Sequence, residues 1–251
     1  FWDAEGYFPE SPEYKRFCEL GKVLDTEIDP ARRKAAWTEM LRLFDANPYA
    51  CPLYTLPMIY AKAQQESRPF HEVLDYYLEL IRKLHIRTYA YLGEMRASTN
   101  PLAYCEGGFY GGHLKPSDKI KPIMKSATAS FGITALNELQ QLHNGKSLVE
   151  DGQFALETLE YINEKVNQFK EEDGNLYAIY GTPAESLCGL QVEQFRKKYG
   201  IIEGVSDRPY VSNSFHCHVT EDLTPIQKQD LEGRFWNLCN GGKIQYVKYP
   251  I

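Results

Sequence analysis

Short apolar segments with strand character alternate along this sequence with longer segments whose apolar residues recur at helical spacing. Segments 128–133 and 176–180 are the clearest strands, and each is followed directly by a helical pattern. Because successive strands separated by helices usually lie parallel in one sheet, this order predicts an α/β architecture with several parallel strands. No repeat, low-complexity tract or linker interrupts the pattern, so we expect a single domain over residues 1–251.

The same patterns predict the other elements, whereas residues 1–28 show no clear period. Asp29 and Pro30 are typical of a helix start, and Asn47-Pro48 of a helix end. Helices are expected at 29–44, 69–95, 118–125, 150–172, 183–199 and 225–233, with one more that ends at His143. Further strands are expected at 51–56, 102–106, 209–219 and 243–249.

Composition and charge argue against several classes of protein. The 251 residues are 43% hydrophobic and 25% charged, which is typical of globular chains. A net charge of −6 argues against a general nucleic-acid binder, because phosphate backbones are bound by clustered Lys and Arg. No apolar run reaches the roughly 18 residues of a membrane span. Six scattered cysteines without a C-x-x-C pair favour a reducing cytosol and predict no metal site.

The sequence YGTPAESLC, residues 180–188, lies where a predicted strand turns into a predicted helix. One interpretation is structural: Thr182 caps the helix, Pro183 occupies its first position, and Glu185 completes a capping box. The other is functional, because free backbone N–H groups and the helix dipole make such a turn an anion site. The residues by themselves favour the structural interpretation.

Two other predicted strand ends carry reactive side chains. Cys105 and Glu106 precede a glycine turn, and a carboxylate beside a thiol could transfer protons or steer a thiol radical. An exposed Glu106 is the simpler interpretation. His216 and His218 would face the same side of the strand at 209–219, but no third metal ligand can be assigned, which favours structural histidines.

Six motifs follow one another over roughly residues 50–251: YTLPMIYAKA, NPLAYCEGG, SATASFGITALNEL, NLYAIYGTPAESLC, YGIIEGVSDRPYVSNSFHCHV and NGGKIQYVKYP. In this order they resemble the barrel of the anaerobic (class III) ribonucleoside-triphosphate reductases, a glycyl radical enzyme family. The resemblance implies the C-terminal part of a ten-stranded α/β barrel, incomplete in this sequence, with residues 1–49 as a divergent region.

The resemblance also implies a reaction and a set of site residues. Members of the family reduce ribonucleoside triphosphates to deoxyribonucleotides: a glycyl radical generates a cysteine thiyl radical, which abstracts the 3′ hydrogen. Glu106 and Cys105 would lie near the reacting ribose. The helix start would hold the substrate phosphates, so the resemblance favours the anion-site interpretation. Its residues are Thr182, Pro183, Ala184, Glu185 and Ser186.

The family further implies a radical S-adenosylmethionine activating enzyme, a homodimer, a cytoplasmic location, and formate or a thiol system as the reductant. The sequence has no counterpart of the glycyl-radical loop, the four-cysteine zinc site or the finger loop. Cys51 is therefore a candidate for the radical cysteine, and Thr55-Leu56-Pro57 replaces the Asn-Leu-Pro of formate-using members. We expect the chain to be inactive by itself.

Two alternatives remain open at this point. The chain could be a divergent, catalytically inactive relative that binds nucleotides as a regulatory subunit. It could also belong to a glycyl radical enzyme that acts on another substrate, although the phosphate turn matches the reductases.

Overall fold

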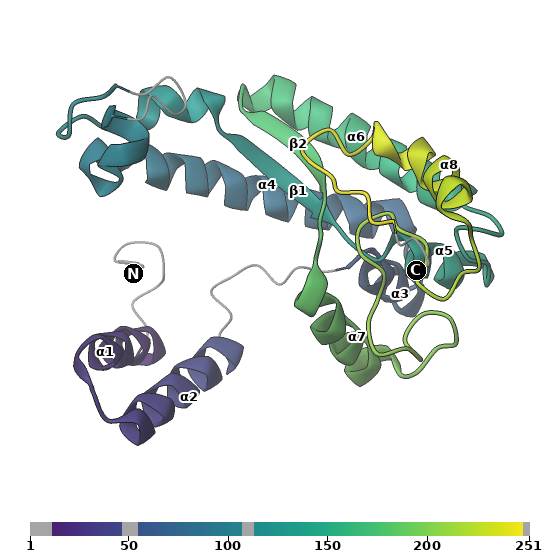
Figure 1. Ribbon diagram of the computed structural model, residues 1–251, viewed down its shortest axis with the longest axis horizontal. Helices are drawn as coiled ribbons and strands as arrows, with labels where there is room; N and C mark the ends of the chain where they lie inside the picture. The colour runs from purple at the N-terminus through teal and green to yellow at the C-terminus, as the bar shows by residue number, and fades with distance from the viewer. Residues whose placement is uncertain (1–11, 47–54, 107–112, 248–251) are drawn as a thin grey trace. The chain divides into compact units, whose positions relative to one another are not determined.

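The computed structural model describes residues 12–46, 55–106 and 113–247. The contacts divide the chain into two compact units, Phe1–Leu53 and Tyr54–Ile251 (Figure 1). The prediction of one incomplete domain stays a prediction. Within the described ranges, no helix is both long enough and apolar enough to cross a membrane.

The first unit contains two helices that pack against each other, α1 (Pro12–Thr26) and α2 (Pro30–Ala46). Leu20 of α1 and Ala36 of α2 are buried in one small apolar cluster. The Asp29 carboxylate accepts a hydrogen bond from the Arg32 backbone N–H at 2.8 Å. Asp29 therefore caps α2, and this predicted helix is confirmed.

The second unit is built around two parallel strands, β1 (Thr128–Ile133) and β2 (Leu176–Gly181). Their register pairs Thr128 with Leu176 at one end and Ile133 with Gly181 at the other. The connection between them consists of α5 (Leu136–Asn144) and α6 (Gln153–Asp173). This is the crossover that the alternation of strand and helix patterns predicts, and it makes the unit a mixed α/β structure that is mostly helical.

One face of the strand pair is covered by α6 and by α4 (Phe70–Glu94). Phe131 of β1 lies between them, with its ring centroid 5.1 Å from that of His85 on α4 and 6.1 Å from that of Phe169 on α6. The apolar stripes of both helices enter the same core, and both predicted helices are confirmed.

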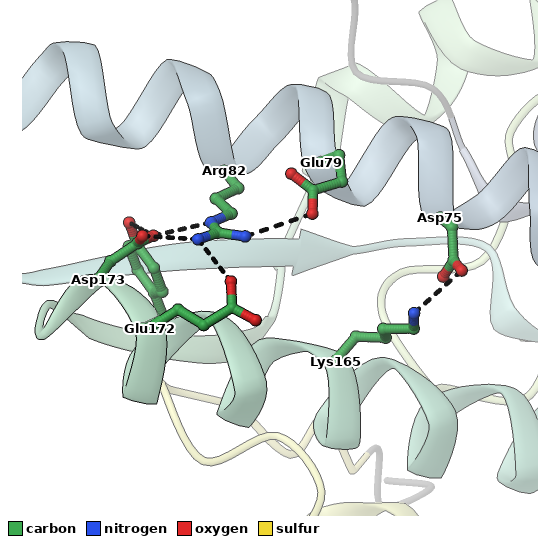
Figure 2. Close-up of polar contacts among 7 residues, drawn as sticks. Asp75, Glu79, Arg82, Lys165, Glu172 and Asp173 are labelled. Atoms are coloured by element: carbon green, nitrogen blue, oxygen red, sulfur yellow. Dashed lines mark hydrogen bonds and ion pairs between the residues drawn. The ribbon is translucent and has the colours of Figure 1, made fainter.

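Ion pairs join α4 and α6 at the rim of this core, as Figure 2 shows. Arg82 Nη2 lies 2.7 Å from Asp173 Oδ1 and 2.8 Å from a Glu172 oxygen. Further along the same two helices, Lys165 Nζ lies 3.0 Å from Asp75 Oδ2. These contacts hold the two helices side by side over the sheet.

On the other side of β2, the segment 240–242 extends the sheet without forming a full strand. Asn240 Oδ1 accepts a hydrogen bond from the Ile179 N–H at 3.0 Å, and the Gly241 N–H donates to the Ile179 carbonyl at 2.7 Å. A Cβ at Gly241 would lie 2.7 Å from the Ala178 Cβ, so only glycine allows this close approach.

The remaining helices surround this centre. They are α3 (Leu56–Gln65), α7 (Glu185–Tyr199) and α8 (Pro225–Trp236), with 3₁₀ segments at Ala97–Thr99 and Lys121–Ser126 and a π-helix at Leu102–Glu106. The predicted helices that end at His143 and begin at Pro225 are confirmed. The short helix expected at 118–125 forms as the 3₁₀ segment three residues later.

Two of the predicted strands differ from the structure where it describes them. Residues 51–54 lie outside the described ranges, but Thr55 caps α3, and its hydroxyl accepts a hydrogen bond from the Met58 N–H at 3.4 Å. The expected strand at 51–56 is therefore wrong in its described part, residues 55–56, because Pro57 occupies the first turn of a helix. The expected strand at 102–106 is also wrong, since these residues form the π-helix.

The expected strands at 209–219 and 243–249 are wrong in their described parts. Residues 209–219 and 243–247 have no regular secondary structure, and 248–249 lie outside the described ranges. Ser214 adopts a positive φ of 41°, which a strand does not accommodate. The alternation of apolar residues at 211–219 reflects individually buried side chains rather than two faces of a strand.

Candidate functional site

Both strands of the sheet turn into helices at the same edge, their carboxyl ends. β1 leads through Ala135 into α5, and β2 leads through Ala184 into α7. The Thr182 N–H donates to the Ile133 carbonyl at 3.3 Å, which places the two turns beside each other. A Cβ at Gly132 would lie 2.5 Å from Thr182 Oγ1, so glycine is required for this approach. In α/β proteins this edge is where ligands bind.

The start of α7 differs from the capping box that the sequence predicts. Ala184, rather than Thr182, is the residue that precedes the helix, and it has no side-chain acceptor. The Thr182 hydroxyl instead donates to the Tyr180 carbonyl at 3.3 Å. The structural interpretation of this turn therefore loses its main support, because the first-turn N–H groups of α7 have no cap from Thr182.

The segment 207–221 packs across this edge through hydrogen bonds to both helices. The Ala135 and Leu136 N–H groups donate to the carbonyls of Ser212 and Ser214 at 3.0 and 3.2 Å. From α7, the Cys188 thiol lies 2.9 Å from Asn213 Oδ1, to which it donates. The start of α5 therefore satisfies the carbonyls of Ser212 and Ser214, which would pair with a neighbouring strand if this segment were part of a sheet.

Glu138 of α5 fixes the same segment from inside the protein. Its side chain is 1% exposed, and Oε1 accepts hydrogen bonds from the Ser212 N–H at 3.0 Å and hydroxyl at 2.8 Å. Burial raises the pKa of the Glu138 carboxyl, against the effect of the Ser212 bonds. The carboxyl group anchors the segment from its buried position.

A cavity of about 410 Å³ opens beside the turn. It is bordered by residues of the segment 210–223, by Cys188 of α7, by Pro225 and Lys228 of α8, and by Tyr246. His216 and His218 both line it, as their predicted common side suggested, although the segment is not a strand. The described residues contain no group of three or more His, Cys, Asp or Glu side chains that could hold a metal ion.

Glu232 of α8 organises the wall of this cavity. It is fully buried, and Oε2 lies 3.0 Å from His216 Nδ1 while Oε1 accepts from the Cys217 N–H at 3.1 Å. Lys228 Nζ lies 2.5 and 2.6 Å from its two oxygens. Burial alone would raise the pKa of Glu232, but the bonds with His216 and Lys228 hold it below its usual value.

The other predicted site residues lie elsewhere. Cys105 is half-buried against the cluster of Ala97 and Ile120, and Glu106 is exposed at the end of the π-helix. The 3₁₀ segment Lys121–Ser126, which carries Ile123 of this cluster, leads directly into the amino end of β1, opposite the turn (Figure 1). Cys51 lies outside the described residues.

The structure keeps the five turn residues together at the carboxyl edge. Ala184 is buried, Thr182 and Pro183 are half-buried, and Ser186 is exposed in the first turn of α7. Glu232 and Lys228 were not identified from the sequence, where the pair has the ordinary spacing of an exposed i, i+4 ion pair.

The described structure is that of a mixed α/β protein whose two parallel strands turn into helices at a common carboxyl edge, the edge at which proteins of this class bind ligands. The family described as anaerobic ribonucleoside-triphosphate reductase matches residues 55–250. Anaerobic ribonucleoside-triphosphate reductases of Salmonella typhimurium and Escherichia coli are 33% and 32% identical to the chain over 201 residues, and that of enterobacteria phage T4 is 30% identical over 193 residues. The chain belongs to this family.

These alignments cover most of this chain and a smaller part of its relatives. They include 78% of the chain for the two bacterial enzymes and 76% for the phage enzyme. The chain spans 28% of the length of the bacterial relatives and 31% of the phage relative.

Proposed function

We propose that the chain is part of an anaerobic ribonucleotide reductase, which reduces ribonucleoside triphosphates to deoxyribonucleotides by glycyl radical chemistry. The observation that carries the proposal is the β2–α7 turn, in a chain that belongs to this family. In the complete enzyme, β1 and β2 would be two neighbouring strands of a ten-stranded α/β barrel. The proposed partners are a radical S-adenosylmethionine activating enzyme and a second copy of the chain, in the cytoplasm.

In this proposal the substrate phosphates bind at Thr182–Ser186. α7 is 15 residues long, so the N–H groups of its first turn and its dipole attract an anion. The exposed Ser186 hydroxyl adds a donor, and Ala184 leaves the helix start uncapped by any side chain of its own.

Cys105, Glu106 and Cys51 are the proposed residues of the radical chemistry. The six residues of β1 extend about 20 Å at 3.3 Å per residue, which separates Glu106 from the phosphate turn. A direct role for Cys105 and Glu106 therefore requires the complete enzyme to bring their segment closer to the turn than it lies here. Formate or a thiol system would supply the electrons.

The test is a Ser186→Asp variant of the 251-residue chain. Asp at this exposed position in the first turn stabilises the helix slightly through the dipole, but it also places a carboxylate at the proposed phosphate position. We expect the affinity for cytidine triphosphate to fall about 10- to 100-fold, or about 1.4–2.8 kcal/mol, as measured by calorimetry.

The matched control is Gln153→Asp, which adds the same charge to the exposed first turn of α6. It should leave the affinity unchanged. An unchanged affinity in Ser186→Asp, together with an equal or higher melting temperature, would make this turn only a helix start.

A further inference from the structure

The cavity beside the turn has the size and lining of a small-molecule site. Its volume of about 410 Å³ lies within the range of about 300–1,000 Å³ that ligand pockets occupy. Val211, Val219 and Leu223 supply an apolar wall, and Tyr210 and Tyr246 supply aromatic rings. Such a lining suits a flat apolar group with a few polar atoms.

The charges of the cavity argue against a phosphate inside it. Lys228 is the one Lys or Arg among the described lining residues, and both Glu232 oxygens already hold its ammonium group. Glu221 adds a carboxylate to the same lining. The cavity therefore favours an uncharged ligand.

His218 is one of the residues that line this cavity, and it carries a ring nitrogen without a hydrogen-bond partner. The side chain is 4% exposed, and its Nδ1 accepts the Thr220 backbone N–H at 3.2 Å. Since Nδ1 is an acceptor, the hydrogen of the neutral ring is on Nε2, and this atom is buried without a partner in the described structure. A buried polar group without a partner costs about 1–3 kcal/mol, which a ligand acceptor would relieve.

His216, two residues away, lines the same cavity. Its Nδ1 lies 3.0 Å from the Glu232 carboxylate and donates to it, which leaves Nε2 as the ring nitrogen available to a ligand. The Tyr246 ring lies edge-on to His216 at 5.5 Å between centroids, and the Tyr210 ring lies nearly parallel to His218 at 6.2 Å. Two ring nitrogens among aromatic rings match the polar edge of a nucleobase.

The position of the cavity links it to the phosphate turn. Cys188 lines the cavity and lies three residues after Glu185, the first residue of α7. We propose that the cavity holds the nucleobase of the nucleotide whose phosphates bind at the start of α7, with His218 Nε2 donating to a ring acceptor. This proposal rests on the proposed function for the connection between the two sites.

The experiment separates the two halves of the ligand. Calorimetry on the 251-residue chain would use cytidine, which has no phosphate, and tripolyphosphate, which has no base. We expect His218→Phe to weaken cytidine binding at least tenfold and to change tripolyphosphate binding less than twofold. Ser186→Asp should weaken tripolyphosphate binding at least tenfold and change cytidine binding less than twofold. His143→Phe, which alters a histidine stacked on Phe154 on another part of the unit, is the matched control.

The outcomes distinguish this proposal from the proposed function. Unchanged cytidine binding in His218→Phe would overturn the base site, as would equally tight binding of free ribose. Cytidine binding that depends on His218, with no tripolyphosphate binding, would support the cavity and contradict the phosphate turn. If His218→Phe does not fold, the imidazole nitrogen NMR signals of the unmutated chain provide the test. We expect cytidine to shift the Nε2 signal of His218, and an unchanged Nε2 signal at saturating cytidine would overturn the proposal.

Discussion

The α4–α6 face and the segment 207–221 are held together by different kinds of contacts. The helices share a continuous apolar core and place their ion pairs at a partly exposed rim (Figure 2). The segment has no regular structure and depends on fully buried polar groups, above all Glu138 and Glu232. On the helical face, the stability comes from many small contacts. In the segment 207–221, it comes from a few buried side chains.

This difference predicts that single substitutions act more strongly in the segment than on the helical face. The reason is physical: a buried group that loses its partner cannot turn to water, whereas an exposed one can. The predictions below test that ordering.

The largest effect is expected for Glu232→Ala. The variant leaves the His216 ring, the Lys228 ammonium group and the Cys217 N–H without their buried acceptor. We expect the free energy of unfolding to fall by about 3–5 kcal/mol, measured by urea denaturation. Glu232→Gln keeps the shape and one acceptor oxygen and should cost less. A loss below about 1 kcal/mol in Glu232→Ala would contradict the comparison.

A smaller effect is expected for Arg82→Met on the helical face. Arg82 binds both oxygens of Asp173, and the side chains are 15% and 13% exposed. Since the pair is only partly buried, we expect a loss of about 1–2 kcal/mol. Lys165→Met removes the more exposed pair with Asp75 and should cost less than about 1 kcal/mol. Equal losses of unfolding free energy in Arg82→Met and Glu232→Ala would contradict the difference between the helical face and the segment 207–221.

The Arg82–Asp173 pair makes the stability of the protein depend on pH in a direction that can be worked out. The hydrogen bonds from Arg82 hold the pKa of Asp173 below its usual value. A carboxyl with a depressed folded pKa stabilises the protein above its unfolded pKa and loses that contribution as the pH falls through the folded value. The stability difference between the wild type and Arg82→Met should therefore be constant near neutral pH and shrink below about pH 4.

The helices that sequence analysis predicted well are those in which periodicity and end signals agree. α4 and α6 have long apolar stripes, and α2 has Asp29 at its start. α1 was missed because its apolar contacts are few and no clear period reveals them. The strand expected at 51–56 is wrong at its described end because Thr55 and Pro57 are a helix start, a signal that apolar content obscured.

The candidate site could be predicted only in part. The turn at 182–186 is visible because glycine, proline and a helix pattern follow a strand within a few residues. The environment of His216 could not be predicted, because its partner Glu232 lies 16 residues away on another element. The unpartnered Nε2 of His218 depends on tertiary burial, which no local pattern encodes.

The central claim is that one nucleotide spans the start of α7 and the adjoining cavity. Its most direct test is the NMR spectrum of the chain during a titration with cytidine triphosphate. We predict that the largest backbone amide shifts occur at Ser186 and Leu187 and at His218, all with the same dissociation constant. Shifts confined to other parts of the chain at saturation, or two unrelated constants for the turn and for His218, would contradict the claim.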